Sequence, residues 1–112
     1  RPHNSGHQTI EANETSQYQQ HLRAILNQPL GSTRLRSASA MVNLLGEDGF
    51  TGEAMYEGMQ KALAIEGVHV HLYGKKITKP FRKMGHVTIV DNDMESLRKK
   101  ANFVKDNLKV KA

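Results

Sequence analysis

The sequence contains no cysteine, no tryptophan and no long apolar run. The absence of cysteine excludes disulfides and thiolate metal sites, and it is compatible with a reducing compartment. A membrane-spanning helix needs roughly 18 consecutive apolar residues, and no secretory signal is visible. Hydrophobic residues make up 38 % of the chain, which is enough for a modest core. We therefore expect a soluble, cytoplasmic protein with no membrane partner.

Positive charge is concentrated in the second part of the chain. Residues 1–66 carry five Lys/Arg and seven Asp/Glu, whereas residues 67–112 carry eleven and four. The two parts therefore have net charges of −2 and +7. Such segregation favours an anionic partner for the second part, although a solvated basic helix face has the same composition.

Two helices are predicted before residue 67, with a strand between them. Ser16 and Gln19 form a capping-box signature, and helical spacing of apolar residues follows up to residue 27. The run AMVNLL at 40–45 predicts a buried strand. A second helix ending at Gly67 is predicted by apolar residues that share one side. These residues are Ala54, Met55, Met59, Ala62 and Leu63.

A hairpin and a final helix are predicted in the remaining residues. The sequence VHVHLY at 68–73 alternates as a strand does, and GHVTIV at 85–90 reads as its partner. Asp93 can cap a helix. The predicted buried stripe of that helix is Met94, Leu97, Ala101, Val104 and Leu108. The predicted fold class is α+β, with a basic connector between the hairpin strands presented to solvent.

The first seven residues, RPHNSGH, are dense in polar side chains. They lack helical periodicity and are rich in turn formers, so a loop or a strand edge is predicted over residues 1–9. Arginine binds phosphate or carboxylate in a bidentate way, and glycine allows close approach of the backbone to a ligand. A ligand site and a merely well-bonded polar loop are both compatible with this composition. Because the chain begins inside so compact a motif, we expect it to be a piece of a longer protein.

Histidines on the predicted hairpin suggest a metal site. His69 and His71 lie two apart on one strand and so share a face, and His86 could pair with them across the hairpin. Imidazole clusters suit transition metals, yet no carboxylate is spaced to complete the site. We therefore expect His69 and His71 to be structural, and no metal site in this chain.

Five cations lie close together in the connector between the hairpin strands: Lys75, Lys76, Lys79, Arg82 and Lys83. A basic loop often binds nucleic acid, but only Phe81 and Tyr73 could stack on bases and no known nucleic-acid motif is present. A small phosphorylated metabolite fits the same loop. There is also no Walker-type loop and no GxGxxG motif. Composition alone predicts an anion-binding protein and leaves the anion open.

Several motifs in this order resemble one family: RPHNSGHQT, SQYQQHLRAILNQPLG, AMVNLLGE, VHVHLYGK and RKMGHVTI. That family is 5-(carboxyamino)imidazole ribonucleotide synthetase, also called the ATPase subunit of phosphoribosylaminoimidazole carboxylase. The resemblance covers nearly the whole chain. It implies an ATP-grasp fold, and a reaction in which ATP and bicarbonate give carboxyphosphate for carboxylation of 5-aminoimidazole ribonucleotide. It further implies magnesium at the nucleotide phosphates and a homodimer.

The resemblance also implies how the chain is organised. Residues 1–45 would form the end of the ATP-grasp domain, and residues 46–112 a small C-terminal domain. The family's ATP-binding lysines and acidic magnesium ligands lie before the motif that opens this chain. The chain alone is therefore expected to be inactive and to depend on the rest of the same polypeptide.

Site residues follow from the matching motifs. Those expected to line the active centre beside the substrate are Arg1, Asn4, Ser5 and His7. Lys75 of HLYGK and Arg82 of FRKMGH match the pair that holds the ribonucleotide phosphate, with Lys83 as a further candidate. No catalytic residue is assigned within the chain. Gln8 departs from the family, in which an aromatic residue often follows the histidine.

Two alternatives remain open at this point. The formate-dependent glycinamide ribonucleotide transformylase has a similar loop and a similar Lys/Arg pair, but it usually has Asp-Thr-Gly where this chain has Asn4-Ser5-Gly6. The other alternative is a non-catalytic anion- or RNA-binding module. Steep salt dependence with long nucleic acids would indicate the latter.

Overall fold

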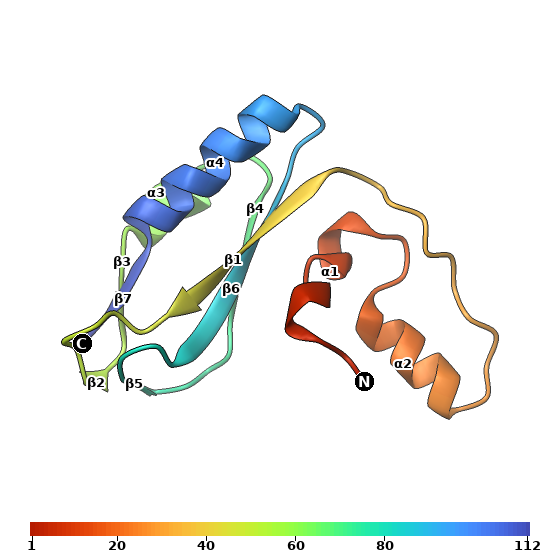
Figure 1. Cartoon of the computed structure of the whole chain (residues 1–112), viewed down its shortest axis with the longest axis horizontal. Coiled ribbons are helices and arrows are strands. Elements are labelled where there is room, and N and C mark those ends of the chain that lie inside the picture. Colours follow the sequence, from red (N-terminus) through yellow and green to blue (C-terminus); the bar gives the residue numbers. More distant parts are fainter.

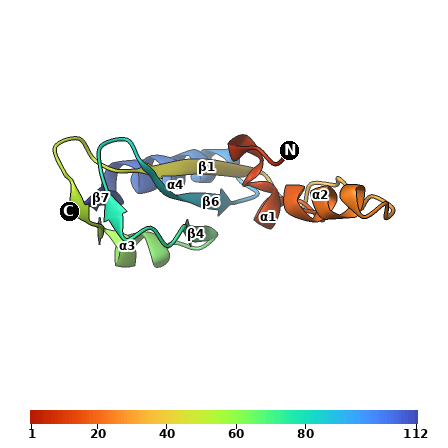
Figure 2. The ribbon, with the colours of Figure 1, turned by 90° about the horizontal axis from the view of Figure 1, so that it is seen from below.

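A three-stranded antiparallel sheet is the centre of the molecule. The computed structural model describes all 112 residues, as a flat, elongated molecule with extents of 46 × 33 × 17 Å (Figure 2). The strands are β1 (Ser39–Leu45), β6 (Lys83–Val90) and β4 (Val68–Leu72), in the order β1-β6-β4. The predicted hairpin and the predicted first strand are confirmed, and so is the α+β class.

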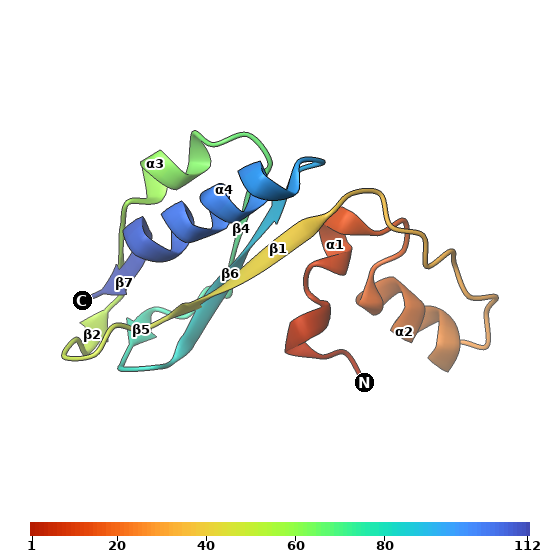
Figure 3. The ribbon, with the colours of Figure 1, turned by 45° about the horizontal axis from the view of Figure 1, so that its top comes forward.

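One face of the sheet is apolar and is covered by two helices, α3 (Met59–Leu63) and α4 (Met94–Asn107) (Figures 1 and 3). The buried core residues on the sheet and helices form one cluster, which is Leu44, Ala62, Met84, Val87, Ile89, Leu97, Val104, Leu108 and Val110. Asp93 caps α4 as predicted, accepting a hydrogen bond from the Glu95 backbone N–H at 3.1 Å. Met94 is an exception to the predicted stripe, because it lies in the first turn and is 51 % exposed.

The helix predicted from residue 54 is wrong over its first part. Two short ribbons occupy this region: β2 (Gly52–Glu53) pairs with β5 (Ile77–Thr78), and β3 (Met55–Glu57) pairs with β7 (Lys109–Lys111).

The physical reason is a pattern that fits both helix and strand. Ala54 and Tyr56 pack against the core while Met55 between them is 65 % exposed, which is strand alternation. The backbone of Gly58 has a φ of 82°, a conformation that glycine adopts without strain, and α3 begins only after it. The partner strand β7 lies more than 50 residues later, and nothing local predicts it.

The N-terminal segment folds as short helical turns and lies on the side of the sheet away from α3 and α4 (Figure 1). It comprises the 3₁₀ turn η1 (Asn4–Gly6), α1 (Thr9–Ala12) and α2 (Gln17–Ile25), so residues 1–9 are not a strand edge. The capping box is confirmed. Gln19 accepts from the Ser16 backbone N–H at 2.9 Å, and the Gln19 backbone N–H donates to Ser16 Oγ at 3.2 Å.

Two further observations concern the architecture as a whole. None of the helices is long and apolar enough to cross a membrane. β1 pairs along its length with β6, so residues 39–45 belong to the same layer as the hairpin. The predicted division of the chain at residue 45 falls at the end of β1 and stays a prediction.

Candidate functional site

The second face of the sheet is polar, and residues 1–12 pack against it. Asn43, His86 and His71 are cross-strand neighbours on β1, β6 and β4, so their side chains share this face. One residue along each strand, the side chains alternate to the apolar face. His86 is only 2 % exposed, and Ala12 of α1 is fully buried. The polar face is therefore the inside of a contact with the N-terminal segment.

Gln17, at the start of α2, holds the segment 1–7 in place. Its Oε1 accepts from the His3 backbone N–H at 2.7 Å, and its Nε2 donates to the His3 carbonyl at 2.9 Å. The same Nε2 lies 3.4 Å from His7 Nδ1. Within the segment, His3 Nδ1 and Ser5 Oγ are 3.0 Å apart. One amide side chain thus fixes the backbone of the motif.

Three imidazoles are stacked where this segment meets the sheet. The ring of His86 lies between His7, at 4.4 Å and 7°, and His71, at 4.6 Å and 19°. We call these three residues the histidine column. Each ring has its own anchor: Tyr18 Oη lies 2.7 Å from His7 Nδ1, Tyr73 Oη lies 2.9 Å from His86 Nδ1, and Glu11 Oε1 lies 2.8 Å from His71 Nε2.

Burial determines the charge within the column. Loss of solvent lowers the pKa of His86 to about 4, with smaller contributions from His7 and His71. Burial also lowers the pKa of His7, assisted by His71 and by the ammonium of Lys83. Desolvation raises the pKa of the Tyr73 phenol, and Tyr18 adds to that effect. Near neutral pH, His86 is uncharged and Tyr73 keeps its proton.

The hairpin cations Lys75, Arg82 and Lys83 lie around the start of β6, of which Lys83 is the first residue. The Lys75 ammonium donates to the Lys83 carbonyl at 2.6 Å and lies 5.8 Å from the centre of the Tyr73 ring. The Arg82 guanidinium donates to the Ile77 carbonyl at 2.7 Å. None of Lys75, Arg82 and Lys83 forms an ion pair with a carboxylate. The other ammonium protons of Lys75 and the other guanidinium protons of Arg82 remain free to bind an anion.

The turn that carries Arg82 is held by Gly46. Its carbonyl accepts from the Phe81 backbone N–H at 2.8 Å, and its own N–H donates to the Arg82 carbonyl at 2.9 Å. A Cβ at this position would collide with the Lys79 carbonyl, so only glycine allows this approach. Phe81 takes a left-handed conformation, with a φ of 65°. The connector is thus fixed against the end of β1.

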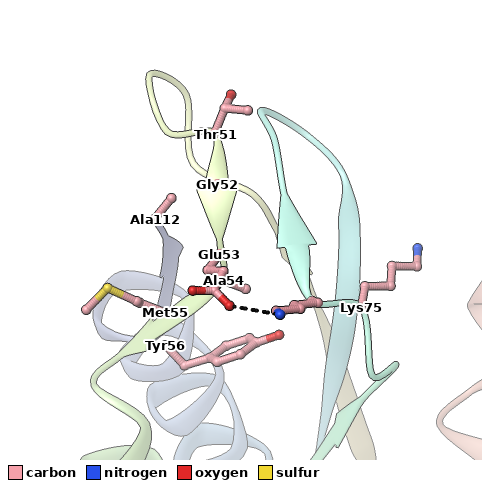
Figure 4. A pocket seen from close by; sticks show the side chains of 9 residues that line it. Thr51, Gly52, Glu53, Ala54, Met55, Tyr56, Lys75 and Ala112 are labelled. Atoms are coloured by element: carbon pink, nitrogen blue, oxygen red, sulfur yellow. Dashed lines mark ion pairs between the residues drawn. The ribbon is translucent and has the colours of Figure 1, made fainter.

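A hollow beside the connector does not contain the site. It lies between β2, β3 and residues 75–76, and Figure 4 shows the side chain of Lys75 extending away from it. Lys76 pairs there with Glu53 at 3.3 Å, between two well-exposed side chains (Figure 4). No residue of the segment 1–12 lines this hollow.

The predicted site residues are only partly brought together. His7 meets the hairpin through His86 and lies close enough to Lys83 for the ammonium to affect its pKa. Asn4 and Ser5 form the η1 turn just before it. Arg1 is exposed and lines a separate hollow against α2, together with Gln17 and His21.

Several members of this arrangement were not predicted from the sequence. Pairing of His86 with His71 across the hairpin is confirmed, although the rings stack instead of converging on an ion. Glu11, Gln17 and Tyr18 were not recognised as partners of the motif. The only local signal is the capping box, which fixes where α2 begins and so where Gln17 and Tyr18 lie, and nothing local marks Glu11.

The residues present do not form a metal centre. No group of three or more His, Asp or Glu side chains is arranged to hold a metal ion. Imidazole lone pairs lie in the ring plane, so parallel stacked rings direct them side by side and not toward one point. Acidic ligands for magnesium are likewise not gathered in this chain.

Comparison with known proteins gives this fold and site a family. Residues 39–100 match the family described as the phosphoribosylaminoimidazole carboxylase C-terminal domain. The N5-carboxyaminoimidazole ribonucleotide synthase of Vibrio cholerae is 45 % identical over 100 residues, which are 89 % of this chain and 24 % of that protein.

Two solved structures have the same fold. The N5-carboxyaminoimidazole ribonucleotide synthetase of Thermotoga maritima has a TM-score of 0.96 at 58 % identity, over 100 % of this chain and 31 % of that one. The synthase of Aspergillus clavatus, in complex with ADP and 5-aminoimidazole ribonucleotide, has a TM-score of 0.79 at 36 % identity, over 95 % of this chain and 28 % of that one.

These matches place the chain in a class of protein, the C-terminal domains of ribonucleotide carboxylases. Because the family match covers more than half of the sequence, the chain belongs to the phosphoribosylaminoimidazole carboxylase C-terminal domain family. The chain spans about a quarter of the length of the Vibrio protein. The transformylase alternative receives no support from these relatives.

Proposed function

We propose that this chain provides part of the ribonucleotide site of an ATP-dependent enzyme that carboxylates 5-aminoimidazole ribonucleotide with bicarbonate. Lys75 and Arg82 hold the phosphate, with Lys83 beside them, and Arg1, Asn4, Ser5 and His7 line the active centre. The Aspergillus clavatus relative, which binds 5-aminoimidazole ribonucleotide, supports the choice of substrate.

One observation carries the proposal: an unbroken series of contacts joins Lys75 of the hairpin to the RPHNSGH motif. Lys75 lies over the Tyr73 ring, Tyr73 bonds to His86, and His86 stacks on His7. Two segments separated by more than 60 residues thus meet at one place. A phosphate on one side and a heterocycle on the other are what such a junction can bind.

The chemistry of these residues is binding and orientation. Charge-assisted hydrogen bonds from an ammonium and a guanidinium suit a phosphate dianion. His7 has its Nδ1 bonded to Tyr18, which leaves Nε2 for the ligand. Because its pKa is lowered, His7 would offer a neutral ring near pH 7.

Other features of the enzyme belong to the same proposal. The family resemblance implies ATP, Mg²⁺ and bicarbonate, a homodimer and a cytoplasmic location. The acidic side chains here do not fit a magnesium site, so no step through the metal is assigned to this chain. We expect the chain alone to hydrolyse no ATP, since it contains no phosphate-cradling loop motif and no cluster of carboxylates for magnesium.

The experiment replaces Lys75 and Arg82 separately by alanine in the full-length enzyme. Loss of one charge-assisted hydrogen bond costs about 1.5–3 kcal/mol, so the KM for 5-aminoimidazole ribonucleotide should rise about 10- to 150-fold. The KM for ATP should change little, because neither cation is assigned to the nucleotide. Steady-state kinetics with each substrate varied in turn gives both constants.

Lys76→Ala is the matched control. Lys76 is next to Lys75 and has the same charge, but it is paired with Glu53 at an exposed position. Its replacement should leave the ribonucleotide KM within about twofold, as for other exposed ion pairs. Wild-type values for both Lys75→Ala and Arg82→Ala would refute the phosphate assignment.

A further inference from the structure

The histidine column and its Glu11 anchor join three segments that are distant in sequence. His7 precedes α1, Glu11 lies within α1, His71 is on β4 and His86 is on β6. The Glu11 carboxylate and the His71 ring are 60 residues apart in sequence, and their side chains are 12 % and 35 % exposed. Contacts of this kind exist only when the segment 1–12 is seated on the polar face. The column therefore reports how that segment is placed.

His86 is the centre of the column and has no exposed surface with which to meet a reactant. It is 2 % exposed, and both faces of its ring are covered, one by His7 and one by His71. Its Nδ1 accepts from the Tyr73 hydroxyl in the tautomer that leaves the proton on Nε2. Nε2 is buried without a hydrogen-bond partner. An unpaired buried polar atom is costly, and Asn43 Oδ1 and Thr88 Oγ1 on the same face are also buried without a partner.

We infer that His86 is a positioning residue: stacked between His7 and His71 and bonded to Tyr73, it fixes the His7 ring and thereby the RPHNSGH segment against the hairpin that carries Lys75, Arg82 and Lys83. This inference rests on the proposed function for the role of those cations. The placement of His7 by His86 is a separate, structural claim.

The charges around the column favour a neutral centre. The groups that face it are His7 and Tyr18 from the N-terminal segment and α2, Glu11 from α1, His71 and Tyr73 from β4 and the residue after it, and Lys83 from β6. Glu11 is the only carboxylate among them, and it is bonded to His71 and not to His86. A positive charge on His86 would therefore lie against two imidazoles with no counter-ion in contact.

The test uses the full-length enzyme with two substitutions at one position. His86→Ala removes the ring, whereas His86→Phe keeps a flat ring and removes both ring nitrogens, including the Nδ1 acceptor. We expect the ribonucleotide KM to rise about tenfold or more in His86→Ala and to be largely restored in His86→Phe. The KM for ATP should stay within about twofold in both. His69→Ala is the control. His69 is exposed on β4, two residues from His71, and stacks on no ring.

A second readout separates this inference from the proposed function. NMR titration of ¹⁵N-labelled histidines follows the His7 ring directly. In His86→Ala the pKa of His7 should rise toward its ordinary value of about 6.5, because solvent reaches the ring. In His86→Phe and His69→Ala it should stay low. This readout decides the placement of His7 even if the Lys75 and Arg82 variants show that the phosphate binds elsewhere.

An unchanged His7 pKa in folded His86→Ala would overturn the inference, and so would an unchanged ribonucleotide KM alongside affected Lys75 and Arg82 variants. If His86→Ala does not fold, His86→Asn answers the same question, because it also removes the ring and keeps a polar side chain. A raised His7 pKa with a ribonucleotide KM several-fold above wild type is then the supporting result. Wild-type values of both would reject the inference.

Discussion

On one face of the sheet, Val42, Val87 and Val70 pack with α3 and α4. On the other face, one residue further along β1 and β4 and one residue back along β6, Asn43, His71 and His86 lie beneath the first twelve residues. The same three strands thus carry two kinds of contact. Apolar burial on the first face is non-directional and depends mainly on area, at about 25 cal/mol per Å². The second face depends on ring stacking and hydrogen bonds of fixed geometry, which specify position more than they add stability.

Because the two faces make different kinds of contact, we expect substitutions on them to have different effects. Substitutions on the apolar face should change stability and leave the ribonucleotide site as it is. Substitutions on the polar face should change ribonucleotide binding more than stability.

The largest effect is expected from Leu97→Ala on the apolar face. Leu97 is 2 % exposed in the core between α4 and the sheet. Truncating a buried leucine leaves a cavity and costs about 2–5 kcal/mol of unfolding free energy. Denaturant unfolding should show this loss, while the ribonucleotide KM of the remaining folded enzyme stays near wild type.

Met94→Ala is the control on the same helix, one turn earlier. Because Met94 is half exposed, its truncation should change the unfolding free energy by less than about 0.5 kcal/mol. Equal losses for the two variants would mean that the helix packs as the sequence pattern predicted, with Met94 inside.

A smaller effect, from the polar face, depends on pH. The folded-state pKa of His86 is about 4, whereas an unfolded histidine titrates near 6.5. The contribution of the neutral His86 ring to the unfolding free energy is therefore fully present above about pH 6.5. It is lost as the pH falls toward 4, because the unfolded chain takes up the proton first. The slope from one proton is at most about 1.4 kcal/mol per pH unit. His7, whose pKa is also lowered, adds in the same direction.

His86→Phe isolates the contribution of His86. Between pH 7.5 and 4, the unfolding free energy should fall less steeply with pH in this variant than in the wild type. The difference in slope corresponds to at most one proton taken up on unfolding. Parallel curves would mean that His86 is not held neutral in the fold. His69→Ala, from the exposed position on β4, should leave the wild-type slope unchanged.

The two faces also differed in how well the sequence predicted them. Alternation along VHVHLY and the stripe of Leu97, Ala101 and Val104 report burial directly, so the hairpin and α4 were predicted correctly. The helix predicted from residue 54 was wrong before α3 because one apolar pattern fits both a helix and the β3 strand, and the partner strand β7 is distant in sequence.

The site was predicted by its motifs and not by its contacts. His7, Lys75, Arg82 and Lys83 were identified through resemblance to a family. Stacking of His7 on His86 depends on how α1 and α2 seat on the sheet, which no local period encodes. Glu11 carried no signal at all, because a single carboxylate in a short helix is typical of any solvated turn.

The smallest effect on stability, and the clearest separation from it, is expected at Gln17. Its side chain makes two hydrogen bonds with the His3 backbone, and these lie at an exposed position where water can replace them. Gln17→Ala should therefore cost less than about 1 kcal/mol of unfolding free energy. The segment 1–7 loses its clamp, however, so the ribonucleotide KM should rise several-fold, with kcat and the KM for ATP less affected.

Gln20→Ala is the matched control for Gln17→Ala. Gln20 lies one turn away on α2 and also makes two hydrogen bonds with one backbone residue, donating to the Gly31 carbonyl at 2.7 Å and accepting from the Gly31 N–H at 2.9 Å. It should cost a similar amount of stability, yet it fixes the loop after α2 and not the motif. If both variants raise the ribonucleotide KM equally, the effect comes from α2 as a whole. If only Gln17→Ala does so, the clamp on His3 positions the site, because each variant loses two hydrogen bonds from the same helix to one backbone residue.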